Sequence, residues 1–194
     1  MAISLQKGQK ISLSKEAAGL DQVLVGLGWD EVEKKFSLFR KQADIDCDAS
    51  AFLLKNNQLK GTDDVVYFGN LKHFSGAVSH MGDNLTGAGE GDDEQLVVEL
   101  QKLPNEYNKV IFVVNIYKAY QRKQSFGNVK NCFIHLIDQR NNQEICRYDI
   151  SGNYDDCTAM IVGELEKTGN EWHFNAIGEG TQDGSLDELT RRYR

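Results

Sequence analysis

Apolar residues along this chain occur mainly in short segments, where they either alternate with polar residues or form runs of β-branched and aromatic residues. A period of two is typical of β-strands, and Gly, Asn and Asp at the ends of such segments are typical of turns. The pattern predicts strands at residues 3–5, 23–27, 45–54, 65–68, 95–100, 110–117, 132–137, 144–149, 158–165 and 171–177.

Two polar segments, NNQ at 141–143 and TGN at 168–170, predict hairpin turns between the last four strands. A short helix is expected in SLDELTRRYR at 185–194, where Ser185 can cap and Glu188 can complete a capping box. Basic residues in its last turn suit the helix dipole. Many short strands and one helix predict an all-β fold, an antiparallel β-sandwich. No linker or repeat divides the chain, so residues 1–194 are expected to form a single domain.

The composition is that of a soluble globular protein, with 40% hydrophobic and 26% charged residues. The net charge of −7 argues against a nucleic-acid partner, because a polyanion needs clustered Lys and Arg. The N-terminal residues lack the apolar run of a signal peptide, and the most apolar segment, residues 110–117, is too short to span a bilayer. We therefore expect a cytoplasmic protein without direct membrane insertion, whose four scattered cysteines are small buried residues.

Acidic residues gather in two segments. The first is DIDCDAS at 44–50, which leads into an apolar run. In a strand, Asp44, Asp46 and Asp48 would share one face and the apolar residues between them the other. Because apolar residues then continue the acidic face, we expect these acids at one end of the sandwich.

The second segment, GDNLTGAGEGDDE at 82–94, contains four glycines, five acids and no base. Two unit charges about 5 Å apart repel by roughly 3 kcal/mol at an effective dielectric of 20. If the segment is ordered, a divalent cation is expected to offset this repulsion. Carboxylates, the Asn84 amide, the Thr86 hydroxyl and glycine carbonyls are hard oxygen donors, which suit Ca²⁺ better than Mg²⁺ or Zn²⁺.

The spacing of neither segment matches a standard site. Ala49 and Lys55 stand where an EF-hand beginning at Asp44 needs Gly and Glu. A phosphate-binding loop is disfavoured because GAGEG lacks the required spacing and a lysine. Three interpretations stay open on the residues alone: a calcium site, a solvated surface loop, and a catalytic carboxylate pair such as Asp46 and Glu94.

A series of motifs covers nearly the whole chain. They are VGLGWD (25–30), DIDCDASAFLL (44–54), HMGDNLTGAGEGDDE (80–94), KVIFVVNIYKA (109–119), QSFGNVKNCFI (124–134), RYDIS (147–151) and GELEKTGNEWHFNAIGEG (163–180). In these motifs the chain resembles the TerD family of tellurium-resistance and general stress proteins. The resemblance implies a β-sandwich whose acidic loops gather at one end and bind calcium, as two ions.

By position in these motifs, the resemblance also implies a set of calcium ligands. These are Asp30, Asp46, Asp48, Asp83, Asn84, Thr86, Asp92, Asp93 and Glu94. Asp44 and Glu90 are weaker candidates, and Trp29 is expected to pack rather than bind. The chain departs from the family pattern in the segment 31–43 and at Lys118, where relatives commonly carry an acid, so one site is expected to be weakened.

The function that the resemblance implies is that of a non-enzymatic, calcium-binding stress-response protein associated with resistance to tellurite and other chemical stress. Calcium would order the acidic loops and create a surface for other stress and tellurite-resistance proteins or for a membrane-associated complex. Two alternatives belong to other classes. One is a hydrolase with paired carboxylates, with or without a metal, and the other is tellurite detoxification by the cysteine thiols.

Overall fold

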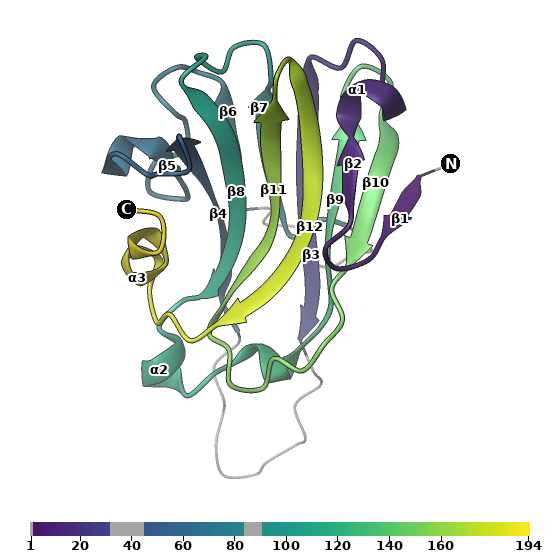
Figure 1. Cartoon of the computed structure of the whole chain (residues 1–194). Helices are drawn as coiled ribbons and strands as arrows, with labels where there is room; N and C mark the ends of the chain where they lie inside the picture. The colour runs from purple at the N-terminus through teal and green to yellow at the C-terminus, as the bar shows by residue number, and fades with distance from the viewer. Residues whose placement is uncertain (1, 32–44, 84–90) are drawn as a thin grey trace.

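The structure is a computed structural model that describes residues 2–31, 45–83 and 91–194. The described residues form two six-stranded sheets, which face each other as the layers of a β-sandwich (Figure 1). The first sheet has the order β1 (Ile3–Leu5), β10 (Gln143–Asp149), β9 (Val129–Asp138), β3 (Gln22–Glu31), β7 (Glu94–Glu99) and β6 (Val78–Asp83). The second has the order β2 (Lys10–Ser12), β12 (Glu171–Thr181), β11 (Ala159–Thr168), β8 (Tyr107–Ile116), β4 (Cys47–Lys55) and β5 (Val65–Val66).

Neighbouring strands pair antiparallel throughout, except that β1 runs parallel to β10. The predicted all-β sandwich is therefore confirmed, with one parallel pair at its N-terminal edge. Short helical segments lie between strands, namely α1 (Leu13–Glu16), η1 (Thr62–Asp64), α2 (Ala119–Arg122) and η2 (Phe126–Asn128), and α3 (Leu186–Arg191) follows the last strand. Within the described part of the chain, no helix is long and apolar enough to cross a bilayer.

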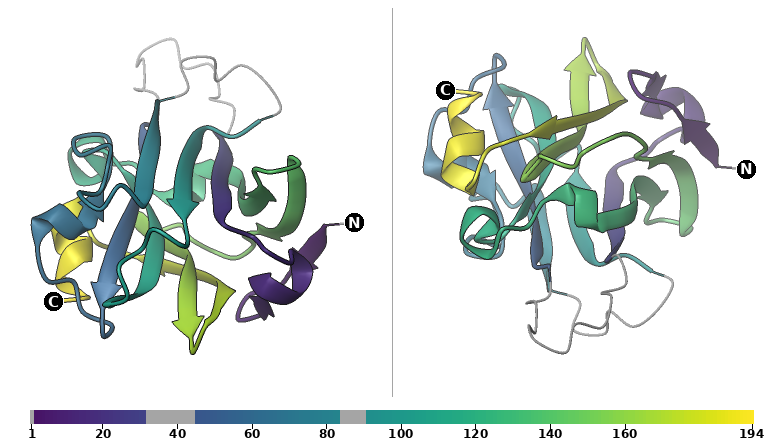
Figure 2. Two further views of the ribbon diagram at one scale, coloured as in Figure 1. Left: turned by 90° about the horizontal axis from the view of Figure 1, so that it is seen from above. Right: turned by 90° about the horizontal axis from the view of Figure 1, so that it is seen from below.

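Alternation places every second residue of β4 in the core between the sheets. Ala49, Ala51 and Leu53 are buried there, which confirms the predicted core face of this strand. Phe52 belongs to a second buried cluster on the opposite face of the sheet. Helix α3 covers that face, with the Tyr193 ring 5.9 Å from the Phe52 ring, and Figures 1 and 2 show α3 beside β4 and β5.

The C-terminal helix was predicted correctly in position. Ser185 accepts a hydrogen bond from the Glu188 backbone N–H at 3.2 Å, as an N-cap does. The Glu188 carboxylate accepts from the Gly184 N–H at 2.7 Å, one residue before the position expected in a capping box. The two predicted hairpins are also present, with Asn142 and Gly169 at positive φ in their turns.

Two strands were not predicted, and both lack the expected signal. β2 has only three residues, and β6 carries His80 and Gly82 in a largely polar sequence. The strand predicted at 65–68 is shorter than expected, because Tyr67 turns back to hydrogen-bond with Asn70. Tertiary pairing rather than local pattern decides such short elements.

Strands β3 and β7 connect the two ends of the sandwich. β3 begins near α1 at the upper end of Figure 1 and ends at the lower end. β7 runs back antiparallel beside it, pairing Leu27 with Glu94 and Gln22 with Glu99. The acids of both strands' lower ends therefore meet at one end of the molecule.

Candidate metal centre at the acidic end of the sandwich

The central feature of this end is an open hollow of about 680 Å³ on the outer face of the first sheet. It lies over β3, β9 and β10, because Phe133 and His135 point away from the core while Ile134 and Leu136 are buried in it. The lining residues are Trp29, Asp30, Gly91, Asp92, Asp93, Asn131, Phe133, His135, Glu144 and Arg147. Three of the acids predicted from sequence, Asp30, Asp92 and Asp93, are thus brought together.

Two glycines of the VGLGWD motif make room for these side chains. A Cβ atom at Gly26 would lie 2.2 Å from Asp92 Oδ2 and 2.3 Å from His135 Nε2. A Cβ atom at Gly28 would lie 2.3 Å from Phe133 Cε1. All three distances are far below van der Waals contact, so β3 must lack side chains at these two positions for the hollow to have this lining.

Asp92 sits directly over the Gly26 backbone. Its Oδ1 lies 2.8 Å from His135 Nε2, and its Oδ2 accepts a hydrogen bond from Gln95 Nε2 at 2.9 Å. His135 has a second acid nearby, since its Nδ1 lies 3.7 Å from Glu144 Oε2. The imidazole therefore lies between two carboxylates at the wall of the hollow.

Asp93 is held by the backbone of β3. Its Oδ2 accepts a hydrogen bond from the Trp29 N–H at 2.7 Å, and its own N–H donates to the Leu27 carbonyl at 2.9 Å. Burial raises the pKa of the Asp93 carboxyl, the Trp29 N–H opposes that rise, and the negative charges of Asp30, Asp92 and Glu94 add to it. The neighbouring acids are therefore close enough to disfavour the ionised form of Asp93.

Asp30 lies at the end of β3 and is exposed. Its Oδ2 accepts a hydrogen bond from Asn131 Nδ2 on β9 at 2.7 Å. Trp29, beside it, packs partly buried against the core while also lining the hollow. Its packing role was predicted.

Glu94 links the two sheets at this end. Its buried Oε2 accepts a hydrogen bond from the Ala49 N–H of β4 at 2.6 Å and lies 3.1 Å from His80 Nε2. His80 Nδ1 accepts from the Gly82 N–H at 3.0 Å, so Nε2 carries the ring proton and donates to Glu94. Because Ala49 follows Asp48, this contact brings the start of β4 next to the acidic start of β7.

Asp46 differs from the other acids, because positive charge already faces it. Its side chain is 53% exposed, and its Oδ2 lies 3.5 Å from Arg122 Nη1. The Arg122 guanidinium and the Lys118 ammonium both lie over the Tyr117 ring, 5.2 and 4.9 Å from its centre. Lys118, singled out in the sequence, is therefore part of a basic group next to Asp46.

The remaining predicted ligands divide into two groups. Asp48 is half-buried on β4, and the backbone of Asp83 pairs with Glu94 at the end of β6. Asn84 and Thr86 lie outside the described residues, as do the weaker candidates Asp44 and Glu90 and most of the segment 31–43. Among residues 2–31, 45–83 and 91–194, no three His, Cys, Asp or Glu side chains are grouped closely enough to hold a metal ion.

Sequence reasoning missed several side chains of this end, above all His135 and the hydrogen-bonding residue Asn131. A usable signal was present in β9, where Asn131, Phe133 and His135 follow one another at a spacing of two and therefore share a face.

The two alternative chemistries can be compared with this geometry. The proposed acid–base partners Asp46 and Glu94 have different surroundings, one in solvent beside Arg122 and the other buried between the sheets. The cysteines are all free. Burial raises the pKa of Cys132 to about 11 and that of Cys146 to about 12, and it raises that of Cys157. The reactive thiolate form is therefore disfavoured at these three positions.

Comparison with known proteins places the chain in a family. The model of the TerD domain matches residues 1–193. "Stress response protein SCP2" of Bacillus subtilis (strain 168) is 47% identical, with 100% of both chains covered. "Tellurium resistance protein TerD" of Serratia marcescens is 45% identical, over 95% of this chain and 93% of that one.

Two solved structures share the fold. One is a protein of unknown function, with a TM-score of 0.67 and 23% identity over 91% of this chain and 99% of that chain. The other is a Streptomyces coelicolor A3(2) homologue of a telluride resistance protein (TerD), with a TM-score of 0.62 and 22% identity over 88% and 98%. From its sequence relatives, the chain belongs to the TerD family of tellurium resistance and stress response proteins.

Proposed function

We propose that this protein binds calcium at the acidic end of its sandwich and that the ion prepares this end for a partner in the response to tellurite and other chemical stress. The observation that carries the proposal is the convergence of Asp30, Asp92 and Asp93 around one hollow, from separate strands. The raised pKa of Asp93 supports it, since neighbouring acids contribute to that shift. A cation placed among these acids would reverse the effect.

The donor set fits calcium chemically. The described side chains at the hollow offer carboxylate oxygens from Asp30, Asp92 and Asp93, and Ca²⁺ takes six to eight oxygen ligands. The described residues alone do not complete such a set. In the proposal, Asp83, Asn84 and Thr86 supply further oxygens to this site, and Asp48 and Asp46 contribute on the side of β4.

Glu94 has a positioning part in this proposal. Its Oε2 is occupied by the Ala49 N–H and His80, so it joins the start of β4 to the start of β7 and thereby holds two acid-bearing segments together. Asp46 is the weakest ligand of the set, because Arg122 would have to move or share the carboxylate with the ion. We therefore expect two ions to bind with unequal affinity.

Bound calcium supplies positive charge that offsets the repulsion among the acids. The chain's own residues then present an ordered end to other stress or tellurite-resistance proteins or to a membrane-associated complex. Tellurite is an anion, so the acidic hollow is not its binding site and protection is indirect. The four free cysteines support a reducing, cytoplasmic location.

Calorimetric calcium titration of the full chain, together with thermal unfolding in EDTA and in millimolar calcium, tests the proposal. Calcium at about 100 times its dissociation constant is expected to add about 2.7 kcal/mol to the free energy of unfolding.

Asp93→Asn is expected to weaken calcium binding by about tenfold or more. Asp187→Asn, the same charge change on exposed helix α3, is the matched control and should leave affinity unchanged. Identical melting curves in EDTA and calcium would reject the proposal.

A further inference from the structure

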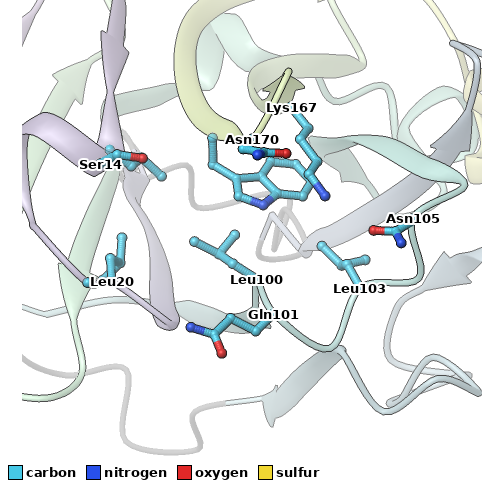
Figure 3. A pocket seen from close by; sticks show the side chains of 11 residues that line it. Ser14, Leu20, Leu100, Gln101, Leu103, Asn105, Lys167 and Asn170 are labelled. Atoms are coloured by element: carbon cyan, nitrogen blue, oxygen red, sulfur yellow. The ribbon is translucent and has the colours of Figure 1, made fainter.

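A second pocket lies at the opposite end of the sandwich, about 350 Å³ in volume. Three connections surround it: α1 with the segment that follows it, the segment between β7 and β8, and the hairpin between β11 and β12. Its lining residues are Leu13, Ser14, Gly19, Leu20, Leu100, Gln101, Leu103, Asn105, Lys167, Asn170 and Trp172. Figure 3 shows these side chains around the pocket, with Ser14 and Leu20 across from Leu103 and Asn105.

The floor of this pocket is apolar and belongs to the main core. Leu13, Leu100, Leu103 and Trp172 are each buried and are part of the core cluster between the sheets. A floor of this kind cannot move without disturbing the packing of both sheets. The pocket is therefore a fixed feature of the fold.

The walls of the pocket are fixed by hydrogen bonds to backbone carbonyls. The Leu100 N–H donates to the Asp21 carbonyl at 2.8 Å, which ties the β7 side of the pocket to the segment after α1. On the other side of that segment, Arg140 Nη1 donates to the Gly19 carbonyl at 2.7 Å. Gly169 adopts a φ of +63° in the hairpin turn beside Asn170. Such anchored walls reduce the entropic cost of binding a ligand.

The rim is rich in hydrogen-bond donors that the protein itself does not use. Ser14, Gln101, Asn105 and Asn170 line the pocket, and no side-chain hydrogen bond joins them to any described residue. Lys167 provides a positive charge. Its Nζ lies 5.9 Å from the centre of the Trp172 ring, and within the described chain it has no carboxylate at ion-pair distance.

The charge of the lining residues favours an anionic ligand over a cationic one. Its eleven residues include one lysine and no Asp, Glu, His or Cys, in a chain with a net charge of −7. The lining therefore offers no anionic side chain to a metal ion or an organic cation. A stacked sugar is disfavoured, because Trp172 is only 7% exposed and offers no open platform. The volume lies at the lower end of the range for ligand pockets, roughly 300–1,000 Å³.

We propose that this pocket binds a small carboxylate with a compact apolar body. Lys167 pairs with the carboxylate, the amides and hydroxyl of the rim donate hydrogen bonds to its oxygens, and the apolar body rests on the leucines of the floor. The site is separate from the acidic hollow and needs no metal, so it does not depend on the function proposed above.

A titration of the full-length protein followed by amide and indole NMR signals tests this. The probe is benzoate, with benzamide as the neutral molecule of the same shape and with chloride adjusted to hold ionic strength constant. Benzoate is expected to give saturable shifts of the Ser14, Gln101 and Asn170 amides and of the Trp172 indole N–H. Benzamide is expected to bind at least fivefold more weakly.

Two variants make the assignment specific. Lys167→Gln is expected to weaken benzoate about five- to tenfold and to leave benzamide unchanged. Lys102→Gln alters a lysine that is outside the lining and pairs with Glu99, so it should change neither affinity. The proposal would be overturned if benzoate and benzamide bound equally well, or if the two variants had equal effects. It would also be overturned if the NMR shifts did not saturate and appeared near exposed lysines in general. So would preferential binding of methyl glucoside in the same assay.

Discussion

The two ends of the sandwich hold two hollows of different character, although residues at or next to the ends of β3 and β7 line both of them. At the acidic end, Asp30 and Asp93 line an open hollow together with an imidazole and a guanidinium. At the other end, a smaller pocket has amides and one lysine around a leucine floor. The ends of the same two strands thus adjoin an acid-rich hollow on one side and, on the other, a pocket whose lining has a lysine and no acid.

Two aspartates show what this difference means for ionisation. Arg140, which also donates to the carbonyl of Gly19 at the second pocket, lowers the pKa of Asp138 mainly through a side-chain hydrogen bond. Burial and neighbouring acids raise the pKa of Asp93 at the acidic end. The chain supplies its own counter-charge to Asp138, whereas in our proposal an external cation offsets the charge of Asp93.

The largest loss of stability is expected from Glu94→Ala at the acidic end. The change leaves the Ala49 N–H and the His80 Nε2–H without their acceptor, in a buried place. We expect a loss of roughly 3 kcal/mol in the free energy of unfolding, measured by urea denaturation in EDTA. Glu94→Gln keeps an acceptor for the Ala49 N–H and should lose less.

Glu144→Ala is the control for this comparison, because Glu144 also lines the acidic hollow but accepts no backbone hydrogen bond among those observed. Its removal should cost less than about 1 kcal/mol. Equal losses for Glu94→Ala and Glu144→Ala would show that the link between β7 and β4 does not hold the sheets together.

The second-largest loss of stability is expected from adding a side chain to the outer face of β3, which carries glycine at position 26. Gly26→Ala places a methyl group where Asp92 and His135 now meet, so those side chains must separate. A loss of about 2 kcal/mol is expected from such overpacking, together with weaker calcium binding by calorimetry. Gly61→Ala meets no atom closer than 3.9 Å and should stay within about 0.5 kcal/mol of wild type. A Gly26→Ala protein with unchanged stability and calcium affinity would contradict this role.

The sandwich was predictable because its long strands follow the hydrophobic pattern. In β4, the alternation of Ala49, Ala51 and Leu53 with other residues gives the core face directly. The same pattern located the short strand β1 but could not reveal β2 or the pairing of β1 with β10, because strands this short take their place from tertiary contacts.

The acids of the candidate site were also recognisable, but their relations were not. Composition and resemblance singled out Asp30, Asp92 and Asp93, which the fold brings to one hollow. The hydrogen bond from Ala49 to Glu94 joins residues 45 positions apart, and no local pattern encodes it. The pocket at the opposite end gave no signal in the sequence, because isolated Asn, Gln and Leu residues in three connections form no motif.

The smallest expected effects are the changes in folding stability with pH. Asp138 and Asp93, at opposite ends of the sandwich, are expected to contribute to these changes with opposite signs. The folded-state pKa of Asp138 is lowered, so the stability it contributes is present above its unfolded pKa of about 3.9 and is lost as pH falls through the folded value. The folded-state pKa of Asp93 is raised. Calcium-free protein therefore loses stability as pH rises from about 3.9 through the folded pKa of Asp93.

Urea denaturation in EDTA across the acidic pH range separates these contributions. Asp93→Asn retains an acceptor for the Trp29 N–H and removes one charge from the acidic end, so it should be more stable than wild type at pH 7. Asp138→Asn should be less stable at pH 7 and approach wild type at the lowest pH. In calcium the advantage of Asp93→Asn should reverse, because the carboxylate that destabilises the metal-free fold is then needed as a ligand. An advantage that persists in saturating calcium would mean that the charge of Asp93 is not offset by the ion, and the contrast between the two ends would then be electrostatic without being functional.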